Sequence, residues 1–190
     1  MDALAPATLV LTDGEVALRC WRDSDAAALA TICRDDVILR WTRVPDGYTE
    51  QMARDRTARA ESERRAGSAL LLAVVTARTD EVLGACDLLL APEDPGRAEI
   101  SYMLGAPARG RGVMARAVAL LARWAIEELG VARVEGFADP ANAASIAVLR
   151  RAGFTEEGLL RAYRVKHGRR DDRVVFSLVG GDLPADPARA

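Results

Sequence analysis

A short loop rich in arginine and glycine lies between a strand-like and a helix-like segment in the middle of the chain. Before the loop, residues 98–104 alternate apolar and more polar side chains, which is the period of a half-buried strand. After it, apolar residues recur at helical spacing over residues 113–124. The sequence therefore predicts a strand, a tight turn and a long helix over residues 99–128. The turn reads Arg109-Gly110-Arg111-Gly112.

This turn has the chemistry of an anion-binding site. A glycine loop that opens into a helix leaves the N–H groups of the first turn without backbone partners, at the positive end of the helix dipole. Arg109 and Arg111 add positive charge, and the glycines let an anion approach the backbone. Neither a Gly-Lys-Ser/Thr loop nor a Gly-x-Gly-x-x-Gly pattern is present. The turn predicts a pyrophosphate site; the alternative is an ordinary strand–helix turn with solvated arginines.

Composition excludes several classes of protein. The 190 residues are enough for one well-buried domain and few for two. With 26 basic and 28 acidic residues the net charge is −2, which argues against a nucleic-acid or membrane-surface binder. Three widely spaced cysteines and one histidine form no metal-ligand pattern. The start of the chain lacks the pattern of a signal peptide, so we expect a cytoplasmic protein. Because no metal-ligand pattern is present, we expect no metal.

Periodicity predicts a mixed α/β (α+β) domain over residues 15–179. We expect a flexible N-terminal arm at residues 1–14, an irregular segment at 36–48 and a flexible C-terminal tail at 180–190. The strands at 69–75, 82–90 and 99–104 are expected to form an antiparallel meander. The predicted helices are residues 24–33, 49–66, 113–128 and 142–152, and the other predicted strands are residues 15–21, 131–138, 154–160 and 174–179.

Three segments resemble one family. Arg109 to Met114 is similar to Arg-x-x-Gly-x-(Gly/Ala), the acyl-CoA pyrophosphate loop of the GNAT (Gcn5-related) N-acetyltransferases, with methionine in the last position. Asn142 to Phe154 resembles the family's Asn-x-x-(Ala/Ser)-Ile…Gly-Phe segment, and residues 82–84 fit its small-residue signature on the third strand. The resemblance covers roughly residues 15–179.

The resemblance implies a GNAT fold: a central mixed, mostly antiparallel sheet of six to seven strands flanked by about four helices. It also implies acetyl-CoA as co-substrate and direct acetyl transfer to a primary amine. The residues expected to bind the cofactor are Met103, Leu104, Arg109, Gly110, Arg111, Gly112, Val113, Met114, Asn142 and Ser145.

Two residues are candidates for catalysis. Glu99 is the candidate base, acting through a water; the alternative is a solvated strand carboxylate or a partner for a nearby arginine. Many family members carry a tyrosine seven residues after the asparagine to protonate the leaving thiolate, but Leu149 stands there. Ser145 is the candidate donor to the thiolate instead; the alternative is a serine bonded to its own helix. Asn142 reads both as a helix cap and as a pantetheine contact.

Details favour one branch of the family. Ser145 and the segments at residues 40–42 and 170–172 are similar to the ribosomal-protein alanine N-acetyltransferases. That branch implies a protein or peptide N-terminus as the acceptor, and a homodimer. The alternatives are a small-molecule amine, such as a polyamine or an antibiotic, and a CoA-binding sensor that has lost turnover.

Overall fold

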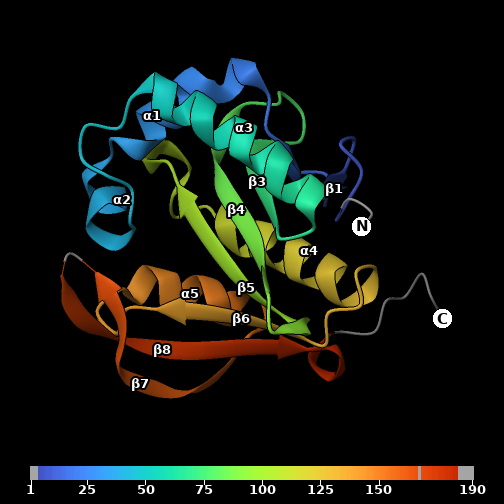
Figure 1. Cartoon of the computed structure of the whole chain (residues 1–190), viewed down its shortest axis with the longest axis vertical. Coiled ribbons are helices and arrows are strands. Elements are labelled where there is room, and N and C mark those ends of the chain that lie inside the picture. The colour runs from blue at the N-terminus through green and yellow to red at the C-terminus, as the bar shows by residue number, and fades with distance from the viewer. Residues whose placement is uncertain (1–3, 167, 184–190) are drawn as a thin grey trace.

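The computed structural model describes residues 4–166 and 168–183, whose strands form one eight-stranded sheet in the order β1-β2-β3-β4-β5-β6-β8-β7 (Figure 1). Every neighbouring pair is antiparallel except β5 and β6, which run parallel. The strands are β1 (Val10–Thr12), β2 (Val16–Cys20), β3 (Ala69–Thr76), β4 (Val82–Ala91), β5 (Asp94–Leu104), β6 (Arg133–Ala138), β7 (Thr155–Lys166) and β8 (Arg169–Val179). The helices are α1 (Ala26–Cys33), α2 (Asp36–Trp41), α3 (Glu50–Ala66), α4 (Val113–Glu127) and α5 (Ala143–Arg151).

Strand β3 and most of β4 are buried on both faces, which explains their continuous apolar runs. Along β3, residues 70, 72 and 74 join the core under α4, while residues 69, 71, 73 and 75 belong to clusters on the other face. Helices α1 and α3 pack over β3 and β4, and α4 packs on the opposite face. The predicted meander β3–β4–β5 and the predicted mixed α/β class are confirmed.

The eighth strand corrects the prediction of six to seven strands, and it places residues 10–12, which we expected in a flexible arm, in the sheet. β1 pairs with β2 from Val10 opposite Arg19 to Thr12 opposite Ala17. Asp13 closes the turn by accepting hydrogen bonds from the backbone N–H groups of Glu15 and Val16. A three-residue strand has too few side chains to show a period, although the Asp-Gly turn is a hairpin signal.

A second correction concerns residues 36–48, which we expected to be irregular. Residues 36–41 form α2, and Asp35 caps it by accepting from the N–H groups of Val37 at 3.0 Å and Ile38 at 3.2 Å. The helix has six residues, less than two turns, so periodicity cannot show it. The cap residue is the signal that could have found it.

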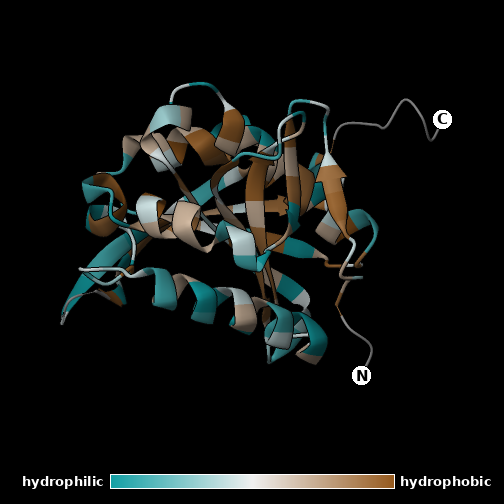
Figure 2. Cartoon of the chain, turned by 90° about the horizontal axis from the view of Figure 1, so that it is seen from above, coloured by the Kyte–Doolittle hydropathy of each residue, from teal (hydrophilic) through white to brown (hydrophobic). Residues whose placement is uncertain are grey.

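The polar helix α3 ends at Gly67, as predicted, with φ of 72°. Figure 2 shows it as a largely hydrophilic helix along the lower edge, in front of apolar strands. Small residues on its inner face, Ala53, Thr57 and Ala60, are buried against the rest of the fold. The C-terminal tail expected from residue 180 begins with a short 3-10 turn, Gly180–Asp182, and residues 184–190 lie outside the described residues.

An exposed ion pair that joins β6 to β7 predicts a pH dependence. Arg133, and then Ser177, lowers the pKa of Glu157 to about 2 from 4.5. A depressed folded-state pKa contributes stability that is fully present above about pH 4.5 and is lost as the pH falls through about 2. We therefore expect Glu157→Gln to have a modestly lower free energy of unfolding than wild type at neutral pH. Near pH 2 the two free energies are expected to be equal.

Urea unfolding across that pH range measures the difference. Glu156→Gln is the matched control, because Glu156 lies on the same strand and pairs with Arg150, whose side chain is 62% exposed. If the difference in free energy of unfolding between Glu157→Gln and wild type stayed the same from neutral pH to pH 2, the lowered pKa of Glu157 would not contribute to stability.

Candidate active site

The parallel strands β5 and β6 separate before they end, and this opening forms the site. They pair from Arg97 opposite Arg133 to Ile100 opposite Gly136, whereas β5 continues to Leu104. Figure 1 shows β5 rising away from β6 toward α2, with α5 beside the open end. Within the described residues, the β6-facing side of residues 101–104 has no strand partner. Unpaired backbone groups at the end of a strand can bind a ligand.

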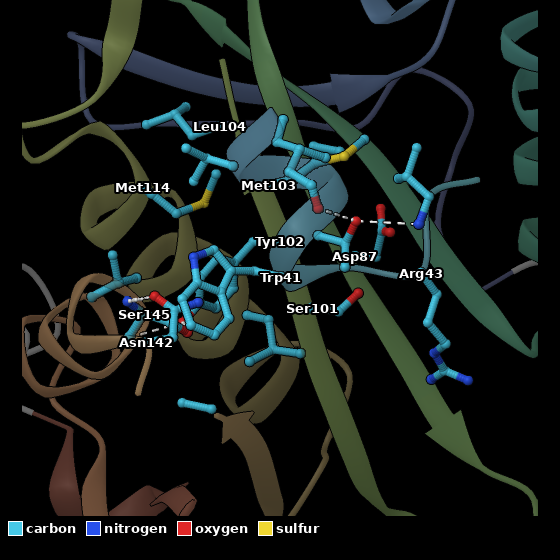
Figure 3. Close-up of a pocket in the computed structure, with 18 of the residues that line it drawn as sticks. Trp41, Arg43, Asp87, Ser101, Tyr102, Met103, Leu104, Met114, Asn142 and Ser145 are labelled. Atoms are coloured by element: carbon cyan, nitrogen blue, oxygen red, sulfur yellow. Dashed lines mark hydrogen bonds between the residues drawn. The ribbon is translucent and has the colours of Figure 1, made fainter. Parts of the chain in front are cut away.

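A cavity of about 1130 Å³ passes through this opening. We call its two parts the loop half and the acceptor half. The loop half is lined by Leu104, Arg109, Gly110, Gly112, Val113, Met114, Asn142, Ser145 and Val148. The acceptor half is lined by Arg43, Tyr48, Met52, Arg56, Arg59, Asp87, Glu99 and Ser101. Figure 3 shows Tyr102, Ser145 and Asn142 on one side of the pocket and Asp87, Ser101 and Arg43 on the other.

The glycine turn enters α4 as the sequence predicts. Gly112 is the N-cap of α4 with φ of 76°, and Gly110 has φ of 75°. A Cβ atom at either position would meet no atom within 4 Å, so open space lies above both. The first backbone bond of the helix runs from Arg116 N to Gly112 O at 3.2 Å, which leaves the N–H groups of residues 113–115 ahead of the helical ladder. The turn therefore fits an anion such as a pyrophosphate.

Met114 fits this turn although the family pattern has a small residue there. Its side chain is 4% exposed and belongs to the core beneath the loop. Figure 3 shows it beside Leu104 at the edge of the pocket. The bulk of the methionine is thus accommodated below the backbone.

The two arginines of the turn differ. Arg111 is exposed. Arg109 instead bonds to two other segments of the protein. Its Nε donates to Leu104 O at 3.1 Å and its Nη2 to Asp35 Oδ1 at 2.6 Å. Arg109 lowers the pKa of Asp35, the residue that caps α2. Arg109 thus ties the end of β5 to the start of α2, a role that its place in the loop did not predict.

Asn142 and Ser145 lie together at the start of α5. Asn142 is the N-cap, and its Oδ1 accepts from Ser145 N at 3.1 Å. The hydroxyl oxygen of Ser145 lies 2.8 Å from Tyr102 Oη, and Tyr102 Oη also lies within hydrogen-bond distance, 3.1 Å, of the Ser145 carbonyl oxygen. Leu149 is fully buried and packs against Gly136 of β6, where an added Cβ would lie 2.5 Å from its Cδ2. The hydroxyl groups at this helix start therefore come from Ser145 and Tyr102.

Glu99 lies at the cavity wall in an ion pair. Arg164 Nη2 donates to both of its carboxylate oxygens, at 2.7 and 2.6 Å. The guanidinium of Arg164 also lies 5.2 Å from the centre of the Phe137 ring. Both side chains of the pair remain partly exposed, at 27% for Arg164 and 29% for Glu99. Glu99 thus lines the cavity and has the arginine partner of the alternative reading, and its role as a base stays a prediction.

The acceptor half contains a buried ion pair that sequence reasoning missed. Asp87 of β4 is 8% exposed, and both of its oxygens accept from Arg56 Nη2 of α3, at 3.0 and 2.7 Å. Burial raises the pKa of Asp87, and Arg56 opposes that shift. Asp87 lies opposite Ser101 in the β4–β5 register. Polar groups thus continue from Glu99 into the wall under α3.

Residues 4–166 and 168–183 contain neither a cluster of metal ligands nor a membrane-spanning helix. No three His, Cys, Asp or Glu side chains gather there as a metal site. None of the helices in that part of the chain is long and apolar enough to cross a membrane.

Known proteins resemble the chain along most of its length. A family model described as the acetyltransferase (GNAT) domain matches residues 15–155. The p20 protein of Bacillus licheniformis, an uncharacterized N-acetyltransferase, is 32% identical over 162 residues, which cover 85% of this chain and 91% of p20.

Two solved structures share the fold. Mycobacterium smegmatis RimJ in complex with CoA-disulfide has a TM-score of 0.83 and 25% identity, and the match covers 100% of this chain and 95% of RimJ. RimL, a ribosomal L7/L12 alpha-N-protein acetyltransferase in complex with coenzyme A, has a TM-score of 0.79 and 20% identity, covering 90% of this chain and 98% of RimL.

Proposed function

Because the chain belongs to the GNAT acetyltransferase family, we propose that it transfers an acetyl group from acetyl-CoA to the N-terminal amine of a protein or peptide. The observation that carries this proposal is the cavity between the separated ends of β5 and β6, with an open glycine turn at one end and polar side chains at the other. The likeness to RimL, a ribosomal L7/L12 alpha-N-protein acetyltransferase, supports a polypeptide acceptor.

The residues of the loop half would hold the acetyl donor. The N–H groups of the glycine turn and the start of α4 suit its pyrophosphate, with Arg111 as a nearby exposed charge. Backbone groups at Met103 and Leu104, together with Asn142, suit the pantetheine arm. Bound acetyl-CoA supplies a thioester whose carbonyl carbon is open to attack by an amine.

The chain's own groups then serve three needs of the reaction. Glu99 accepts the proton that the amine loses, directly or through one water. Backbone N–H groups near Met103 and Leu104 stabilise the negative charge that develops on the carbonyl oxygen. Ser145 donates a hydrogen bond to the sulfur as it leaves. The transfer is direct, so no side chain becomes acetylated.

The test of this function is calorimetric titration with acetyl-CoA of wild type, Gly112→Asp and Gly112→Asn. Both substitutions place a side chain of nearly equal size at a left-handed position that Asn and Asp tolerate better than other residues. The aspartate adds a negative charge where the pyrophosphate is expected. We expect Gly112→Asp to bind acetyl-CoA at least about tenfold more weakly than Gly112→Asn, because the added carboxylate repels the pyrophosphate. A tenfold loss of affinity corresponds to about 1.4 kcal/mol.

The control is Gly130→Asp, at the far end of α4, where φ is 77° and an added Cβ also meets no atom within 4 Å. This variant is expected to bind like wild type. A folded wild type without affinity for acetyl-CoA, or equal binding by both Gly112 variants, would contradict the pyrophosphate site. Turnover with N-terminal peptides, compared with polyamines and amino sugars, then tests the acceptor class.

A further inference from the structure

Tyr102 joins β5 to the start of α5 across the opening through a hydroxyl pair with Ser145. Its position lies two residues beyond Ile100, the last β5 residue that pairs with β6. The side chain therefore reaches over the gap between the strands. Its hydroxyl meets Ser145, 43 residues later in the chain, at 2.8 Å. Figure 3 shows the pair beside Asn142, with Trp41 near them in the same pocket.

The geometry allows two arrangements of the hydroxyl protons. The Ser145 carbonyl is an acceptor, so Tyr102 can donate to it at 3.1 Å while Ser145 Oγ donates its proton to Tyr102. Alternatively, Tyr102 donates to Ser145 Oγ at 2.8 Å, and the serine proton is then free to point into the cavity. Only the second arrangement leaves Ser145 able to donate to a ligand. A negative charge in the cavity favours it.

We propose that Tyr102 is a positioning residue that donates to Ser145 Oγ and so directs the serine proton to the sulfur of coenzyme A. This rests on the proposed function. In the transfer, the amine nitrogen forms the new C–N bond, the C–S bond breaks, the sulfur leaves as a thiolate, and the amine proton goes to Glu99. Tyr102 and Ser145 keep their protons and stabilise the thiolate by two successive hydrogen bonds.

The surroundings of Tyr102 suit a donor that stays protonated. Burial raises the pKa of its phenol well above the usual value, against a smaller opposing effect of the bond to Ser145. A phenol with a raised pKa remains an O–H donor through the neutral range. The backbone of Ser145 is fixed as well, because its N–H donates to the Asn142 cap. Both ends of the hydroxyl pair are therefore held in place.

The experiment measures the pKa of the coenzyme A thiol bound to the protein, from the ultraviolet absorbance of the thiolate. It needs no acceptor. A hydrogen bond to a charged group is worth enough to lower that pKa by about one unit relative to free coenzyme A. We expect wild type to show this shift and Ser145→Ala to lose it. Tyr102→Phe keeps the ring but removes the hydroxyl, and it is expected to lose at least about half of the shift in the thiol pKa.

Two controls separate this role from a structural one. Tyr163→Phe removes a hydroxyl from an exposed tyrosine that stacks on Phe137, and the shift is expected to stay as in wild type. In a Ser145→Ala background, adding Tyr102→Phe is expected to change nothing further, because Tyr102 acts through Ser145. Calorimetric affinity for coenzyme A is expected to be equal in wild type and Tyr163→Phe.

The outcomes are distinct. Coenzyme A bound with the same thiol pKa in wild type and Tyr102→Phe overturns the role of Tyr102 and leaves the proposed function standing. An equal effect of Tyr102→Phe with and without Ser145 also overturns it, because Tyr102 would then act independently. A folded wild type that does not bind coenzyme A overturns both proposals.

Discussion

The Asp87→Asn variant is expected to unfold with a free energy about 3–5 kcal/mol below that of wild type. Asp87 and Arg56 form a pair whose side chains are 11% and 17% exposed. Asparagine keeps the shape of the aspartate but not its charge. The guanidinium would then remain buried without a counter-charge, and this accounts for most of the expected loss.

Arg56 has little else to hold it. In the part of the chain that the structure describes, its buried Nε finds no hydrogen-bond partner, and its Nη2 makes both bonds to Asp87. The pair also joins α3 to the sheet at the wall of the acceptor half. Loss of the carboxylate is therefore expected to loosen α3 as well as to lower stability.

Urea unfolding of three further proteins defines the effect. Glu50→Gln breaks the exposed Glu50–Arg54 pair on the same helix and is expected to cost under about 0.5 kcal/mol. The double variant Asp87→Leu/Arg56→Met removes both charges and is expected to recover most of the stability lost in Asp87→Asn. A single Asp87→Asn variant within about 1 kcal/mol of wild type would contradict the pair's role.

Patterns within short segments of the sequence predicted the glycine turn and the long helix that follows it. The predicted tight turn is present, with Gly110 and Gly112 in left-handed conformations, and the predicted helix follows it directly as α4. Turn chemistry and helical period are properties of short segments, so the sequence can show them. The resemblance to the GNAT family, drawn from three such segments, is confirmed by the family model. The two missed elements, β1 and α2, are too short to carry a period.

Contacts between distant segments could not be predicted in this way. Arg109 reads as a charge for an anion but pairs with Asp35, 74 residues earlier. Tyr102 reads as a half-buried strand residue, and nothing in its neighbourhood points to Ser145. Asp87 did carry a signal: a lone carboxylate in the apolar run of residues 82–90 must find a buried partner. That partner, Arg56, lies on a helix whose many arginines look alike in sequence.

Glu99→Gln is expected to lower kcat about 10²–10⁴-fold with little change in the affinity for acetyl-CoA. Glutamine keeps the shape of the side chain at the cavity wall but cannot accept the amine proton. The size of the loss is expected to depend on the acceptor. An α-amino group, with a pKa of about 8, is partly neutral at neutral pH and needs less help than a lysine side chain at about 10.4.

Glu135→Gln is the matched control. Glu135 lies directly opposite Glu99 in the β5–β6 register and also pairs with arginines, Arg97 and Arg133, but it does not line the cavity. A purely structural role for strand carboxylates at this position would give both variants a similar loss of activity and of stability. We expect instead that Glu99→Gln loses turnover while its unfolding midpoint stays near that of Glu135→Gln.

The partner of Glu99 completes the test. Arg164→Gln removes the guanidinium that holds the carboxylate at 2.6–2.7 Å, so it frees Glu99 without removing it. We expect this variant to keep measurable turnover, because the carboxylate that accepts the amine proton remains at the cavity wall. Equal, complete loss of turnover in Glu99→Gln and Arg164→Gln would assign the pair to structure and remove Glu99 as the base.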